Sequence, residues 1–67
     1  MISENLKRIR ERKGISQSEL SRASGVSQSM IAQLERGTKA LTFITAKILV
    51  DALDCKLDDL LDDQKGA

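Results

Sequence analysis

Residues 16–37 decide the fold of this chain, and they read SQSELSRASGVSQSMIAQLERG. The pattern predicts two short helices joined by a tight turn. Ser16 and Glu19 have the spacing of a capping box, in which each side chain bonds the backbone amide of the other at the start of a helix. Gly25 suits the left-handed conformation that ends a helix, and Ser27 is a good N-cap for the next one.

Similar signals divide the rest of the chain. Leu6 and Ile9 share one face of a first helix that Gly14 ends, and Thr42 is an N-cap for a fourth helix. No strand-period alternation is present, so we expect an all-α, compact five-helix domain over residues 1–62 and a frayed tail over 63–67. The expected helices, with their N-caps included, cover about residues 3–13, 16–24, 27–36, 42–53 and 57–61.

The composition argues against several classes of protein. The 67 residues are enough for one small domain. Because Cys55 is the only cysteine, we expect no intrachain disulfide, which fits a cytoplasmic location. Because histidine is absent, we also expect no metal site, cofactor or catalytic residue. No apolar run is long enough to predict a membrane span or secretory signal.

The charge is distributed unevenly along the chain. Residues 1–40 carry eight Lys and Arg against four Glu, whereas residues 41–67 carry three Lys against six Asp. A basic part of this kind can meet a polyanion while the acidic part faces away, although two ordinary solvated surfaces would give the same counts.

The fourth helix is apolar on more than one side. One stripe can serve the core, and it consists of Phe43, Ala46, Leu49, Val50 and Leu53. Ile44 and Ile48 are four residues apart and lie off that stripe. A small monomer has little interior left for them, so we favour a subunit interface, with a wider core as the alternative.

The outward face of the third helix carries polar groups suited to DNA. Gln28 and Gln33 lie within about 140° of each other around the helix, and both avoid the face of Ile31 and Leu34. A Gln side chain can bond adenine N6 and N7 in the major groove. Ser29 either contacts the DNA or only helps to cap the helix. We predict base contacts from Gln28, Ser29 and Gln33, although glutamines are also common solvated residues.

The ordered set of these residues resembles the Cro/C1-type (XRE) helix-turn-helix family, which includes the lambdoid phage repressors. The resemblance covers about residues 6–61, and its carriers are Leu6-x-x-Ile9-Arg10, Gly14-Ile15-Ser16-Gln17, Glu19-Leu20, Gly25-Val26-Ser27, Ile31, Leu34-Glu35-Arg36-Gly37 and Ala52-Leu53. Each piece is weak alone, but the set at these spacings is specific. The family implies a five-helix fold whose third helix enters the major groove.

The resemblance also implies roles beyond the outward face. In the phage repressors, the residues that match Arg10 and Glu35 form a mostly buried ion pair that braces the first helix against the third. The resemblance gives Gln17 a phosphate contact at the start of the second helix, where backbone amides also favour an anion. The other predicted contacts with the DNA backbone lie at the two ends of the third helix and are Ser27, Arg36, Thr38 and Lys39. The main role of Ser27 is that of an N-cap.

The chain departs from the family pattern at three positions. Leu41 stands where a proline is frequent, Asp54 stands where a glycine usually follows the Ala-Leu pair, and Lys56 stands where a better cap is common. The sequence therefore specifies the end of the fourth helix and the last turn less strongly than the other boundaries.

The sequence thus predicts a sequence-specific DNA-binding transcriptional regulator, most simply a repressor, that binds a palindromic double-stranded operator as a homodimer. The predicted dimer interface consists of Ile44, Ile48, Leu57 and Leu61. Because the chain leaves no room for a ligand-binding domain, regulation would come from concentration, a regulatory protein partner or competition for sites. The alternative is a protein-binding module on the same fold, such as an antitoxin or antirepressor.

Overall fold

A computed structural model describes residues 2–61, and five α-helices follow one another in this range. The predicted all-α class is confirmed. Residues 62–67, where the end of the domain and the frayed tail were predicted, lie outside the described residues. The helices are α1 (Ile2–Arg12), α2 (Gln17–Ser24), α3 (Gln28–Arg36), α4 (Phe43–Leu53) and α5 (Leu57–Leu61).

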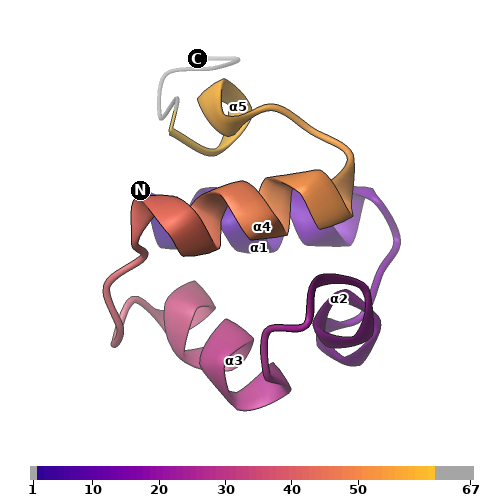
Figure 1. Cartoon of the computed structure of the whole chain (residues 1–67), viewed down its shortest axis with the longest axis horizontal. Helices are drawn as coiled ribbons and strands as arrows, with labels where there is room; N and C mark the ends of the chain where they lie inside the picture. Colours follow the sequence, from indigo (N-terminus) through magenta and orange to yellow (C-terminus); the bar gives the residue numbers. More distant parts are fainter. Residues whose placement is uncertain (1, 62–67) are drawn as a thin grey trace.

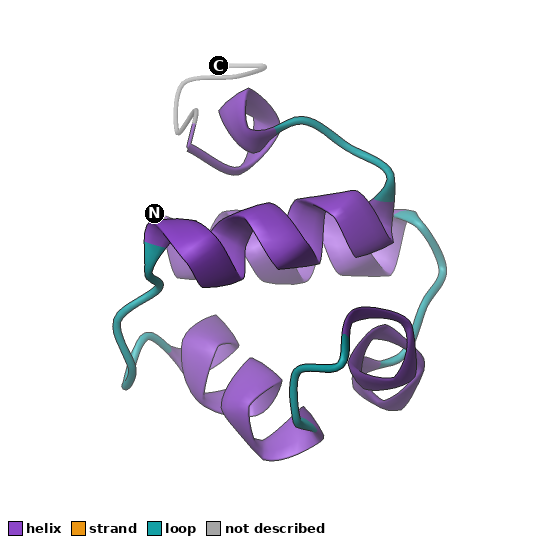
Figure 2. Ribbon diagram, viewed as in Figure 1, coloured by secondary structure: helices purple, strands orange, loops and turns teal. Residues whose placement is uncertain are grey.

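The helices pack in three levels around one interior. In Figure 1, α4 lies in front of α1, with α5 above both and with α2 and α3 below them. α5 packs on α1 and α4, α3 packs on α1, and α2 packs on α3 and α4. Short loops join all five helices, as Figure 2 shows. Segments far apart in sequence therefore share one core, and α2 and α3 form one end of the molecule.

Aliphatic side chains fill this core, as the near absence of aromatic residues requires. Each of the five helices contributes to it. The buried apolar residues are Leu6, Ile9, Leu20, Ile31, Leu34, Ala46, Leu49, Val50, Leu53 and Leu60. Several of these side chains are fully removed from water, which stabilises the fold by roughly 1.5–3 kcal/mol for each large aliphatic group.

The predicted helix starts are confirmed by their hydrogen bonds. The Glu19 amide donates to Ser16 Oγ at 3.0 Å, and the Ser16 amide donates to Glu19 Oε1 at 2.8 Å, so the capping box is complete. Ser27 Oγ accepts from the Met30 amide at 3.1 Å. Thr42 caps α4 in the same way. Each cap satisfies a backbone donor that a helix start otherwise leaves unpaired.

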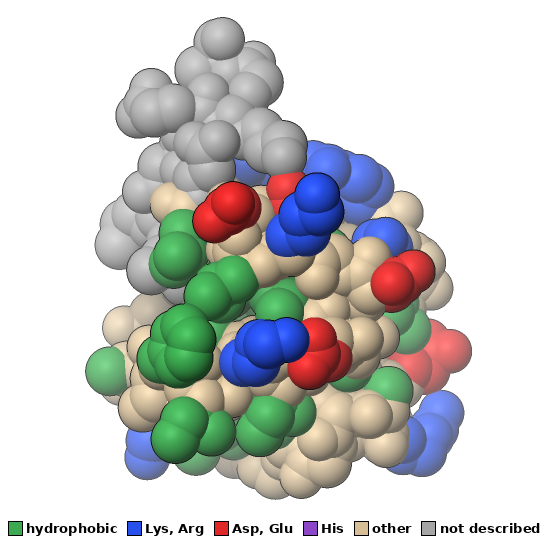
Figure 3. All heavy atoms as spheres, turned by 45° about the horizontal axis from the view of Figure 1, so that its top comes forward, with side chains coloured by type: hydrophobic (Ala, Val, Ile, Leu, Met, Phe, Trp, Pro, Cys, Tyr) green, Lys and Arg blue, Asp and Glu red, His purple; other side chains and the backbone are tan. Residues whose placement is uncertain are grey.

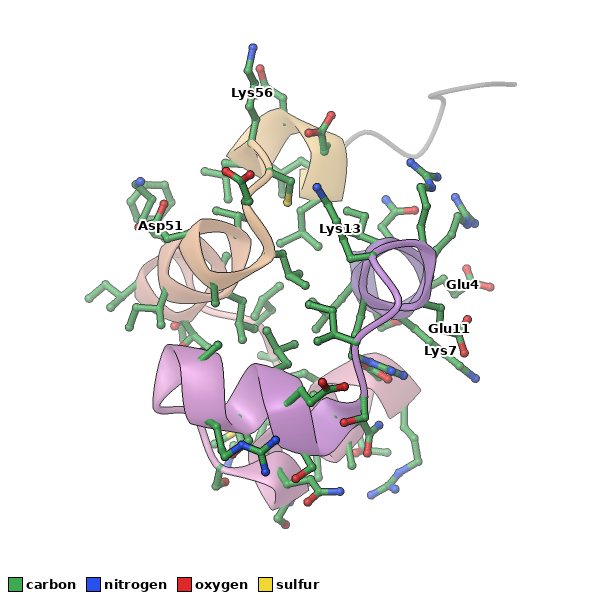
Figure 4. The ribbon with its side chains drawn as sticks, turned by 90° about the vertical axis from the view of Figure 1, so that its right-hand side faces the viewer. Glu4, Lys7, Glu11, Lys13, Asp51 and Lys56 are labelled. Carbon is green, nitrogen blue, oxygen red and sulfur yellow. The ribbon has the colours of Figure 1, made fainter. Side chains whose placement is uncertain are left out.

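The end of α4 is held without the usual glycine. Asp54 adopts the left-handed conformation, with φ 56° and ψ 49°, and its amide donates to the Asp51 carbonyl at 3.2 Å. The Lys13 ammonium donates to the Asp54 carbonyl at 3.3 Å, and Figure 4 shows Lys13, which directly follows α1, pointing toward this turn. Lys56 is a poor cap, but its amide donates to Asp59 Oδ2 at 3.1 Å, which starts α5.

A buried asparagine fastens α5 to α1. Asn5 is 3% exposed, and its Nδ2 donates to the Leu60 carbonyl at 2.9 Å. The Arg8 guanidinium donates to Asn5 Oδ1 at 3.3 Å. The last turn of a five-residue helix has few internal hydrogen bonds, so this side chain supplies a partner from another element.

The prediction that Phe43 belongs to the core is wrong. Its side chain is 70% exposed, although Ala46, Val50 and Leu53 on the same stripe are buried. Phe43 is the first residue of α4, and Leu41 from the preceding loop packs against the core instead. A residue in the first turn can share the angle of a buried stripe and still lie beyond the elements that cover that stripe.

Candidate DNA-binding surface

The turn between α2 and α3 is tight and well anchored. Gly25 has φ 80°, and its amide donates to the Ser21 carbonyl at 2.9 Å. The amide of Val26 donates to Ser24 Oγ at 3.1 Å, and its half-buried side chain packs against the core. A side chain at position 25 would be strained at this φ. The turn therefore fixes α3 relative to α2.

α3 divides into a buried face and a polar outward face. Ile31 and Leu34 are 0% and 3% exposed, so they hold the helix against the core. Gln28 and Ser29 are exposed at the start of the helix, and Gln33 is half-buried one turn later. The outward face thus has the three polar residues that the sequence predicted for it, on a helix whose position is set by packing.

Two of these residues bond to each other. Gln33 Nε2 donates to Ser29 Oγ at 3.3 Å, across one turn of the helix. The spacing of four residues between a hydroxyl and an amide is the sequence signal for this contact, since such pairs face each other on a helix. The contact between Ser29 and Gln33 was not predicted from the sequence.

The C-terminal end of α3 is closed by the loop that follows. Gly37 is left-handed, with φ 79°, and a Cβ there would lie 3.4 Å from Ser3 Oγ. The Thr38 amide and hydroxyl both donate to the Gln33 carbonyl, at 3.1 and 3.2 Å. Arg36, Thr38 and Lys39 are all exposed here. The two cations thus stand free for an anion beside the end of the outward face.

An ion pair under this surface braces α1 against α3. Arg10 Nε donates to Glu35 Oε2 at 2.6 Å, and Arg10 Nη2 donates to Glu35 Oε1 at 3.0 Å. The two side chains are 10% and 3% exposed, respectively. Arg10 Nη1 also donates to the Ile15 carbonyl at 2.9 Å, which extends the contact to the turn before α2. The bidentate geometry is the strong form of an Arg–carboxylate contact.

Gln17 joins this buried pair, which the sequence did not indicate. Its Nε2 donates to Glu35 Oε1 at 3.0 Å, and the side chain is half-buried. One amide hydrogen of Gln17 is thus bonded inside the protein, while its second amide hydrogen and Oε1 make no hydrogen bond with the described residues. The first residue of α2 is therefore held in place by α3.

The electrostatics of the pair follow from these contacts. Burial alone would raise the pKa of Glu35, but the hydrogen bonds from Arg10 and Gln17 and the charge of Arg10 outweigh burial and hold that pKa below its ordinary value. The hydrogen bonding between Arg10 and Glu35 also raises the pKa of Arg10. Arg10 and Glu35 are therefore both charged at neutral pH.

The residues predicted for a dimer interface lie on another part of the surface. Ile44, Ile48 and Leu61 are 72%, 40% and 50% exposed, whereas Leu57 is half-buried against the core. Figure 3 shows apolar side chains gathered toward one side of the face formed by α4 and α5. The structure thus leaves apolar side chains uncovered here. Phe43, which was wrongly predicted to lie in the core, is also exposed.

Three further observations describe residues 2–61 away from the surface of α3. This part of the chain contains no group of three His, Cys, Asp or Glu that could hold a metal ion. None of its helices is long and apolar enough to cross a bilayer. Burial raises the pKa of the Cys55 thiol, with Asp59 adding to the effect, so this thiol is less reactive than a free one.

Comparisons with known proteins decide the family. Residues 6–60 match the family model described as helix-turn-helix. The chain belongs to the Cro/C1-type helix-turn-helix family. The chain is 40% identical over 53 residues to the uncharacterized HTH-type transcriptional regulator y4dJ from Sinorhizobium fredii, a match that covers 79% of this chain and 69% of the relative.

A solved structure agrees with this family. The restriction-modification controller protein C.AhdI from Aeromonas hydrophila superposes with a TM-score of 0.85 at 30% identity, covering 88% of this chain and 89% of that one. The expected resemblance and fold are confirmed. As a member of this family, the chain is a DNA-binding transcriptional regulator.

Proposed function

We propose that this regulator represses transcription in the cytoplasm by binding a palindromic operator as a homodimer, with α3 of each copy in the major groove. The observation that carries the proposal is the exposed polar face of α3, which is held between a capped start and a closed end. A helix reads bases well when packing and turns fix its position before it meets the DNA.

Sequence discrimination comes from the outward face of α3. The amides of Gln28 and Gln33 can each bond an adenine through N6 and N7, and Ser29 lies on the same face. Ile31 and Leu34 turn away from this face, so the polar side chains are directed outward. We assign the base contacts on this face to Gln28 and Gln33, and Ser29 either contacts the DNA itself or acts through its neighbour Gln33.

Contacts with the DNA backbone flank this face. The second amide hydrogen of Gln17 can meet a phosphate at the start of α2, and the Ser27 hydroxyl can donate to one while its oxygen caps α3. Arg36, Thr38 and Lys39 are exposed at the other end of α3. Such contacts set the position of the protein on the duplex and carry no sequence information.

The homodimer rests on the uncovered apolar area of α4 and α5. Ile44, Ile48 and Leu61 are the exposed members, and Leu57 is half-buried. Two copies related by a two-fold axis would place their α3 helices about one turn of DNA apart, roughly 34 Å. Each copy alone reads only a few base pairs, so pairing also supplies the length of site that specificity needs.

The same apolar area favours a second candidate function. A protein-binding module, such as an antitoxin or antirepressor, would use Ile44 and Ile48 to bind another protein, and a regulatory partner could also bind there. The two functions differ in what happens without that partner. A DNA-binding repressor selects a defined site by itself, whereas a module of the second kind does not.

Selection from a pool of random duplexes at fixed salt tests the main proposal. The parent protein should enrich a palindromic motif, and ultracentrifugation should show two copies on one selected site. Failure to enrich any motif would overturn the proposal and favour the protein-binding module. An Ile44→Glu/Ile48→Glu variant should stay folded and bind the site as a single copy, with weaker affinity. A folded double variant that still pairs on DNA would move the interface away from α4.

A further inference from the structure

The hydrogen bond between Ser29 and Gln33 gives the outward face a feature that residue types alone do not. Gln33 Nε2 donates to Ser29 Oγ at 3.3 Å. We propose that Ser29 is a positioning residue that sets the amide of Gln33 to read adenine and to reject guanine. The inference rests on the proposed function, because it takes Gln33 as a base-reading residue of α3.

The argument depends on counting donors and acceptors. A glutamine amide has two N–H donors and one carbonyl acceptor. Adenine offers one acceptor, N7, and one donor, the N6 amino group, whereas guanine offers two acceptors, N7 and O6. With one Nε2 hydrogen bonded to Ser29, Gln33 keeps one donor and one acceptor. This remainder matches adenine and leaves one guanine acceptor without a partner.

Gln33 is bonded through both its backbone and its side chain. Its backbone carbonyl accepts from the amide and the hydroxyl of Thr38, so the backbone at position 33 is fixed. Only the side-chain torsions remain free, and the bond to Ser29 restricts them. A side chain that is held in its reading geometry before binding loses less entropy when it meets a base.

The competing role for Ser29 is a direct contact with a base. Both roles predict that removing the hydroxyl changes binding, so the two must be separated by where the effect appears. If Ser29 acts through Gln33, its effect falls on the base pair that Gln33 reads and disappears when Gln33 is absent. If Ser29 contacts a base itself, its effect persists without Gln33.

The experiment uses the site that the parent selects, with each position changed in turn to all four base pairs. The position read by Gln33 is the one whose preference disappears in Gln33→Ala. At that position the parent should favour adenine over guanine by roughly 5- to 160-fold. Ser29→Ala should reduce this ratio by about 2- to 12-fold, the worth of one hydrogen bond. Ser29→Thr keeps the hydroxyl and should retain the ratio.

The outcomes separate the inference from the proposed function. In the Gln33→Ala background, Ser29→Ala should have no further effect on any base preference. If Gln33→Ala removes a preference but Ser29→Ala leaves the adenine-to-guanine ratio unchanged, only the inference is overturned. An effect of Ser29→Ala at a different base pair, or one that persists without Gln33, also overturns it. If Gln33→Ala changes no preference, the assignment of Gln33 falls and the inference falls with it.

Discussion

Replacing Arg10 with methionine should cost far more stability than the loss of an exposed cation. The guanidinium makes three hydrogen bonds, two to Glu35 and one to the Ile15 carbonyl. Methionine fills similar volume but leaves Glu35 as a carboxylate that is 3% exposed and keeps only Gln17 as a donor. Stranding a buried charge costs about 3–5 kcal/mol, and the bond from Gln17 places the expectation near the lower end of that range.

Urea unfolding at neutral pH measures this cost. The matched control is Lys47→Met, which removes the cation of an exposed ion pair with Asp51 and should cost at most about 0.5 kcal/mol. A second variant, Arg10→Met/Glu35→Leu, removes both charges and should recover most of the loss, because a packed apolar pair can replace a buried ion pair. The reasoning would be refuted if Arg10→Met unfolded at the same urea concentration as Lys47→Met.

Three further predictions concern pH, α5 and the DNA backbone. The pKa of Glu35 is lower in the folded chain than its ordinary value of 4.5, so its stabilising contribution is complete above pH 4.5 and is lost as the pH falls through the folded-state pKa. In urea unfolding at a series of acid pH values, Arg10→Met/Glu35→Leu should therefore lose less free energy of unfolding on acidification than the parent. Equal losses in the two proteins would contradict this. Asn5→Ala leaves the Leu60 carbonyl without its donor and should lower the free energy of unfolding by about 1–3 kcal/mol, whereas an unchanged midpoint would show that this contact contributes nothing. Arg36→Ala should lower the magnitude of the salt slope of DNA binding by about 1. Lys56→Ala should not, because Figure 4 shows Lys56 beside α5, at the end of the molecule away from α2 and α3. Equal effects would mean that only net charge matters.

Local chemistry made most of the fold predictable. The position of a helix start depends on a side chain and a backbone amide within four residues of each other. This is the case for the capping box of Ser16 and Glu19 and for the N-caps Ser27 and Thr42. Gly25 ends α2 for an equally local reason, since φ is positive there. Helix boundaries of this kind need no knowledge of the tertiary structure. The ion pair of α1 and α3 came only from the family resemblance.

The features that sequence did not predict depend on neighbours distant in the chain. Phe43 has the periodicity of a core residue, but whether any element covers the start of α4 is a tertiary fact. Asn5 is buried because α5 ends against α1, and Gln17 bonds Glu35 because α2 and α3 meet there. Periodicity shows which face a residue occupies, but it does not show how far the neighbouring helices reach.

The central claim is that side chains on the outward face of α3 read DNA sequence, and repeating the random-duplex selection with Gln28→Ala tests it most directly. Gln28 is exposed and makes none of the capping bonds, so the variant should fold as the parent does. Its selected motif should lose the preference at one base pair in each half-site, worth roughly 1–3 kcal/mol, while every other position is retained. An identical motif from the parent and the variant, at equal affinity, would contradict the assignment of Gln28. If Gln33→Ala also left the motif unchanged, α3 would not be the reading helix.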